Sequence, residues 1–147
     1  MARHDRDVVP VEKVLVYIQH EGRLLVLRHP EHPEAGVQVP GGTRRSGEEP
    51  EVAALREARE ETGLTGLRIV RLLGMTEHDM RPFGKDETHR RHVFELALDD
   101  EPPERWHHHE DDPEGGGAPI LFELSWEPLS ELPELIAGHG ELVDRLC

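Results

Sequence analysis

Three glutamates near the middle of the chain have the spacing of a metal site. Glu57, Glu60 and Glu61 stand at i, i+3 and i+4 within 51–62, a segment rich in Ala, Glu, Arg and Leu that is predicted to be helical. A helix places side chains with this spacing on one face. The carboxylates would repel one another near a helix end that already carries negative charge. A divalent cation would relieve both conflicts, and an all-carboxylate ligand set favours Mg2+, with Mn2+ as a substitute.

The acidic composition of the chain provides an alternative explanation for this pattern. The chain has 31 Asp and Glu against 17 Lys and Arg, for a net charge of −14. Arg56 lies four residues before Glu60, and Arg59 is nearby, so a solvated acidic face held by simple ion pairs has the same spacing. The spacing alone favours neither interpretation.

The whole segment 42–64 resembles the Nudix box, G-x5-E-x7-R-E-U-x-E-E-x-G-U, in which U is aliphatic. The lead-in Pro40-Gly41-Gly42 and a predicted hairpin before it also look like this family. The resemblance implies an α/β/α sandwich with a mixed sheet, in which the box forms a loop, a helix and a second loop. The fixed positions of the box are filled by Gly42, Glu48, Arg56, Glu57, Glu60, Glu61 and Gly63, and the aliphatic ones by Ala58 and Leu64.

The resemblance also implies an activity, the hydrolysis of a nucleoside diphosphate linked to another group, with Mg2+ as cofactor. Glu57, Glu60 and Glu61 would hold the metal, and the backbone carbonyl of Gly41 would add a ligand. Metal ions neutralise the oxygens that shield phosphorus and generate hydroxide from bound water. A carboxylate can take the proton of that water, and within the box Glu57 or Glu60 is the favoured candidate.

The remaining box residues have structural roles in this interpretation. Glu48 and Arg56 would orient the helix and loop through an ion pair. Gly42 would let the chain turn close to the metal. Gly63 is placed to end the helix as a left-handed cap.

A further acidic residue is expected from the segment 99–117, which is rich in Pro and Gly and is predicted to be a long loop. The family often supplies a metal-binding or basic carboxylate from such a loop, and Glu110 is the preferred candidate. Glu104, Asp112 and Glu114 compete with it. Trp106 could stack on a substrate, or it could hold the loop against the body of the protein. The run His107-His108-His109 suggests zinc, but adjacent loop residues rarely converge on one ion.

Two residues before the box are candidates for substrate binding. Arg28 ends a predicted strand and resembles an arginine that touches substrate phosphates in several family members, although a surface role fits equally well. Tyr17 could stack on a base, although packing within the first strand is the favoured role.

The predicted elements form one domain over 1–147, beginning with a polar arm over 1–10. The mixture of strands with a central helix and a late helix indicates an α/β fold. The expected strands are 11–18, 23–28, 37–39, 64–77, 88–98 and 120–126, and the expected helices are 51–62 and 134–146.

Composition excludes several other classes of protein. Cys147 is the only cysteine, which rules out an intrachain disulfide. The strong negative charge and the lack of a basic stripe argue against DNA, RNA or an anionic membrane as a partner. The charged segment 1–7 lacks the apolar run of a secretory signal, so a cytoplasmic protein is expected. A homodimer is possible.

The substrate is expected to be a nucleoside diphosphate derivative or a nucleoside triphosphate. The alternative function is a Nudix-fold module that senses a nucleotide or metabolite without turnover. Such modules usually lose box carboxylates, and this chain keeps them all. The complete box therefore favours catalysis.

Overall fold

The computed structural model describes residues 9–111, 113 and 116–146, so most of the predicted arm lies outside it. Its centre is β1 (Val11–His20), where every residue from Val14 to Ile18 is buried. A continuous apolar run of this kind is typical of a strand covered on both faces. Alternate side chains of β1 accordingly enter two separate cores.

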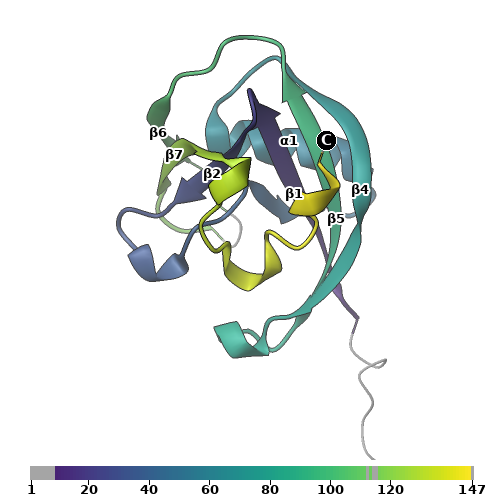
Figure 1. Ribbon diagram of the computed structural model, residues 1–147. Coiled ribbons are helices and arrows are strands. Elements are labelled where there is room, and N and C mark those ends of the chain that lie inside the picture. The colour runs from purple at the N-terminus through teal and green to yellow at the C-terminus, as the bar shows by residue number, and fades with distance from the viewer. Residues whose placement is uncertain (1–8, 112, 114–115, 147) are drawn as a thin grey trace, which may run out of the picture.

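A seven-stranded mixed sheet is built around β1 (Figure 1). Its order is β4-β5-β1-β2-β7-β6, and β3 pairs separately with β1. The β1–β5 pair is parallel, and the other pairs are antiparallel. The remaining strands are β2 (Arg23–Arg28), β3 (Gly41–Thr43), β4 (Leu67–Asp79), β5 (Thr88–Leu98), β6 (Arg105–Glu110) and β7 (Ile120–Pro128).

Strands β1 and β2 pair only beside their turn, at Gln19↔Leu24 and His20↔Arg23. Beyond that point β1 pairs with β3, and β2 forms an isolated bridge to Gln38. The predicted strand 37–39 is therefore reduced to isolated bridges made by Val37 and Gln38.

Helix α1 (Pro50–Thr62) covers one face of the sheet. Pro50 occupies the first turn, where its missing N–H costs nothing, and Gly63 ends the helix with φ 74°. Both the helix and its glycine cap confirm the sequence prediction. The helix contacts the sheet through the small side chains of Ala53, Ala54 and Ala58, whereas Val52 is exposed.

The opposite face is covered by the C-terminal segment, which lies in front of the sheet in Figure 1. The predicted helix 134–146 was wrong, because Ala137 and Gly138 have positive φ values that interrupt an α-helix. Leucines of this segment pack on the second core. The segment forms three short 3-10 turns, η4 (Leu129–Glu131), η5 (Ile136–Gly138) and η6 (Val143–Arg145).

The predicted loop 99–117 was also wrong in its middle, where β6 pairs with β7.

The α/β class, the mixed sheet and the two covered faces confirm the expected fold. The edge strand β4 carries two extra residues relative to β5, Val70 and Leu73. Among the described residues, no helix is long and apolar enough to cross a membrane.

Candidate active site

The loop before α1 is fixed to the helix by the ion pair between Glu48 and Arg56. Arg56 donates from Nε and Nη2 to the two Glu48 carboxylate oxygens, at 2.8 and 2.9 Å, and from Nη2 to the Thr43 carbonyl at 3.0 Å. This hydrogen bonding lowers the pKa of Glu48 from 4.5 to about 2 and raises the pKa of Arg56. The predicted orienting pair is present in the structure.

Three carboxylates meet beside this pair. Glu57 and Glu60 from α1 lie with Glu110 from the end of β6, each offering an oxygen within 4.8 Å of the others. Glu57 is 1% exposed and Glu110 is 7% exposed. Arg56 Nη1 lies 3.2 Å from Glu57 and 3.4 Å from Glu60. We call Glu57, Glu60 and Glu110 the glutamate cluster; burial of so much like charge favours a bound cation.

Glu61 points toward a neighbouring position. Its Oε1 accepts a hydrogen bond from the backbone N–H of Gly41 at 2.7 Å. Glu61 thus stands apart from the three clustered oxygens but lies next to Gly41, the backbone position predicted to add a ligand. The sequence pattern grouped Glu61 with Glu57 and Glu60, and Glu110 was expected to join them; the oxygens that lie within 4.8 Å of one another are those of Glu57, Glu60 and Glu110.

Two box glycines make room for these contacts. A Cβ atom on Gly42 would overlap the Glu57 carboxylate, so only glycine lets β3 pass this close to α1. A Cβ atom on Gly63 would lie 2.7 Å from Nδ1 of His108. The two glycines therefore allow β3 and β6 to approach the helix.

Strand β6 is positioned by three alternate side chains that face α1. Trp106 Nε1 donates to the Thr62 carbonyl at 2.8 Å, and His108 Nε2 lies 3.0 Å from the Glu60 carbonyl. Both carbonyls belong to the last turn of the helix, where backbone oxygens lack helical partners. Glu110 is the next residue on the same face and enters the glutamate cluster. Of the two roles considered for Trp106, the structure supports holding this segment against the protein.

The other candidates lie elsewhere. Tyr17 is fully buried; its hydroxyl donates to the His139 carbonyl at 2.6 Å, and burial raises its pKa to about 12. Arg28 donates to Ser125 Oγ at 3.1 Å. Glu104 is exposed and pairs with Arg23. Asp112 and Glu114 lie outside the described residues.

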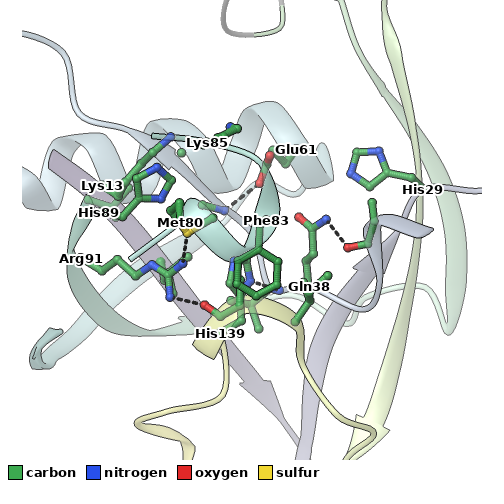
Figure 2. Close-up of a pocket in the computed structure, with 18 of the residues that line it drawn as sticks. Lys13, His29, Gln38, Glu61, Met80, Phe83, Lys85, His89, Arg91 and His139 are labelled. Carbon is green, nitrogen blue, oxygen red and sulfur yellow. Dashed lines mark hydrogen bonds between the residues drawn. The ribbon is translucent and has the colours of Figure 1, made fainter. Parts of the chain in front are cut away.

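A pocket of about 680 Å3 adjoins this site, and no sequence pattern predicted it (Figure 2). It reaches Gly41, Gly42 and Glu61, and its other walls come from β1, the 29–39 segment, the 80–85 turn, β5 and the 136–139 segment. Its size is within the range of small-molecule sites. Sequence reasoning missed its lining because these segments lie far apart in the chain.

The donor set of the site fits a hard divalent cation. Every side chain of the glutamate cluster offers oxygen, as does Glu61, and Mg2+ and Mn2+ prefer oxygen ligands. Zinc would favour histidine or cysteine, but alternation along β6 turns only His108 toward α1.

A glutamate-rich loop, helix and loop carried on a mixed sheet between two covered faces define the Nudix class of fold. The family model of the NUDIX domain matches residues 10–146, and the chain belongs to this family.

Curated relatives resemble the chain over about half of its length. Diphosphoinositol polyphosphate phosphohydrolase 3-alpha of Mus musculus is 36% identical over 80 residues, which are 54% of this chain and 44% of that protein. The human diphosphoinositol polyphosphate phosphohydrolase 2 is 35% identical over 80 residues, or 54% and 40% of the two chains. The match thus spans less than half the length of these relatives.

Solved structures resemble nearly the whole chain. A MutT NUDIX hydrolase from Burkholderia pseudomallei superposes with a TM-score of 0.66 and 26% identity, covering 95% of this chain and 99% of that one. A UDP-X diphosphatase has a TM-score of 0.68 and 20% identity, with coverage of 94% and 61%. At 20% identity, the similarity to the UDP-X diphosphatase concerns the fold alone.

Proposed function

We propose that the chain is a metal-dependent hydrolase that cleaves the pyrophosphate linkage of a nucleoside diphosphate derivative or a nucleoside triphosphate. The observation that carries this proposal is the glutamate cluster, in which the buried Glu57 and Glu110 meet Glu60 across two elements. A structural core has no need for three converging carboxylates, whereas a metal site requires them. The names of relatives such as the diphosphoinositol polyphosphate phosphohydrolases support hydrolysis of a diphosphate bond.

The proposed cofactor is Mg2+, held by Glu57, Glu60 and Glu110 with Glu61 and the Gly41 carbonyl beside them. When bound, the ion would neutralise phosphate charge and acidify a water molecule. A carboxylate of the glutamate cluster takes the proton as the water oxygen bonds to phosphorus, and the bond from phosphorus to the bridging oxygen breaks. The leaving phosphate keeps that electron pair. Glu48 acts indirectly, by holding Arg56 against the carboxylates.

Three further features stay predictions from the sequence. They are the cytoplasmic location, the absence of nucleic-acid partners and the possible homodimer. The negative charge of −14 supports the second of these.

A phosphate-release screen tests the proposed function. Purified protein is incubated with nucleoside triphosphates, dinucleoside polyphosphates, nucleotide sugars and diphosphoinositol polyphosphates, each with Mg2+, Mn2+ or EDTA. We expect release from at least one compound with a divalent cation, none with EDTA, and a loss of at least ~100-fold in Glu61→Gln. Mg2+-dependent nucleotide binding without release from any compound would instead support the sensing module.

A further inference from the structure

The pocket beside the glutamate cluster concentrates positive charge in a strongly acidic protein. The chain has two lysines, Lys13 and Lys85, and both line this pocket together with Arg91. In Figure 2, Lys13, Lys85, His89 and Arg91 lie on one side, and His29 lies on the other. The acidic lining residues are Glu34 and Glu61, and Glu61 is engaged with Gly41. One wall is therefore cationic.

Arg91 is the most unusual residue of this wall. It is only 2% exposed, and its guanidinium donates to the Ala137 carbonyl at 2.6 Å and contacts Met80 Sδ at 3.7 Å. Within the described part of the chain, no carboxylate oxygen lies within the 4.0 Å of an ion pair with Arg91. Burial accordingly lowers its pKa. Since no carboxylate of the described residues contacts this buried cation, an anion in the pocket would lower the cost of its burial.

The neighbouring titratable groups leave the wall positive. His139 Nδ1 accepts a hydrogen bond from the Val39 N–H, and burial, with Arg91 and other cations, lowers its pKa to about 3. Two acids lie near this wall: Glu87 pairs with His89 at 2.7 Å, and the charge of Glu141 raises the pKa of Arg91 against the effect of burial. Lys85 and Lys13 both contribute to the lowered pKa of Glu87. Lys13, Lys85 and Arg91 together carry one positive charge more than Glu87 and Glu141 can neutralise.

The rest of the pocket can accept an uncharged body. Met80, Phe83 and Ile136 supply apolar surface, and Phe83 is 44% exposed. An exposed ring beside a cationic wall suits a base or sugar that carries an anionic group. The pocket reaches Gly42, which lies against the Glu57 carboxylate. One molecule can therefore extend from the pocket to the glutamate cluster.

We propose that Lys13, Lys85 and Arg91 form a phosphate subsite for a substrate group other than the diphosphate that is cleaved. The inference rests on the proposed function. It assigns a substrate class, namely diphosphates in which one of the two linked groups carries an additional phosphate. Arg91 forms the floor of the subsite, and the two lysines approach from β1 and the 80–85 turn.

Anion binding without metal tests the subsite independently of catalysis. The Glu57→Gln protein, in EDTA, is titrated with inorganic phosphate and then tripolyphosphate and followed by amide NMR. We expect saturable shifts at residues 13, 84–85 and 91, and tighter binding of tripolyphosphate. Lys85→Met should weaken binding at least 5-fold; Lys85 is exposed, so this variant should fold. The control is Arg81→Met, a cation of the same turn that pairs with Asp79 at 2.7 Å.

Kinetics then test the substrate class. Among diphosphates that the wild-type protein hydrolyses, Lys85→Met should raise KM at least 10-fold for those with a further phosphate and less than 3-fold for those without one. The proposal would be overturned if Lys85→Met raised KM equally for both groups of diphosphates. It would also be overturned if Arg81→Met weakened phosphate binding as much as Lys85→Met does. Subsite binding in a protein that hydrolyses nothing would refute the proposed function alone, and hydrolysis without subsite binding would refute this inference alone.

Discussion

At the scale of single residues, the site depends on carboxylates whose surroundings differ sharply. Glu57 and Glu110 are buried, whereas the Glu60 side chain is 33% exposed. Glu48 belongs to the ion pair and is kept charged by Arg56. The same side-chain type is thus given two roles, ligand and anchor, by its neighbours.

Glu110→Gln should lower kcat at least ~100-fold with little change in KM, because a carboxylate that handles a proton or a metal acts mainly in the transition state. Asp111→Asn is the matched control, since Asp111 is the next residue and is exposed. Steady-state kinetics on any compound the wild type cleaves provide the measurement. Similar small effects of both substitutions would remove Glu110 from the reaction.

Glu48→Gln should destabilise the fold by about 2 kcal/mol at pH 7, as expected for lost hydrogen bonds to a charged partner. The folded pKa of Glu48 is lowered from 4.5 to about 2, so its contribution is complete above about pH 4.5 and is lost as the pH falls toward 2. Urea unfolding from pH 7 to 3 should therefore show the wild type and the variant converging on the acidic side. A constant difference across this range would contradict the assigned cause.

At the scale of elements, the site is a meeting of β3, α1 and β6. Gly42 brings β3 against Glu57, and the alternate residues Trp106, His108 and Glu110 bring β6 against the end of the helix. Helix ends need partners for their last carbonyls, and β6 supplies two of them. The contacts that hold β6 in place also place Glu110.

Trp106→Phe keeps an aromatic ring but removes the hydrogen bond to Thr62, so stability should fall by about 1 kcal/mol. Amides of β6 should exchange faster with solvent, and kcat should fall because Glu110 is less well held. Trp126→Phe is the comparison: it removes a similar bond, to the Pro103 carbonyl, from the same core cluster but away from the last turn of α1. If both variants lower kcat equally, β6 does not position Glu110.

Gly42→Ala should place a methyl group against the Glu57 carboxylate and lower kcat by ~100-fold, since displacing a reacting group by about 1 Å has this effect. Gly47→Ala provides the comparison, because Gly47 has positive φ but open space around its Cα. It should cost stability alone. Activity assays beside thermal melts separate the two effects.

Sequence reasoning succeeded where signals were local. The helix, its cap and the Glu48–Arg56 pair depend on residues close together in the chain. It failed for β6, whose alternation was hidden by three histidines among acidic, Pro-rich residues, and for the C-terminal helix, which positive φ at Ala137 and Gly138 interrupts. The cationic pocket wall was missed because its residues meet only after folding.

At the scale of the whole molecule, burial of the glutamate cluster links folding to cation binding. A cation that binds only the folded state stabilises it by mass action, by about 2.7 kcal/mol at 100 times Kd. For a chain of this size we expect Mg2+ or Mn2+ at that excess to raise Tm by about 5–10 °C over EDTA-treated protein.

Na+ at matched ionic strength should raise Tm much less, and Glu57→Gln should lose most of the Mg2+ effect. Differential scanning calorimetry with and without each cation measures both. Coincident melting of chelated and Mg2+-loaded wild type would contradict a cation site at the glutamate cluster.

The two extra residues of β4 affect how the protein behaves in concentrated solution. β4 ends the sheet, is 13 residues long and exposes Val70, Leu72 and Met75. A straight apolar edge of this length would be a template for strand addition and aggregation. Bulges at Val70 and Leu73 bend a strand and break the even spacing of its outward hydrogen-bonding groups. Irregularity at this edge thus favours solubility where the side chains alone would not.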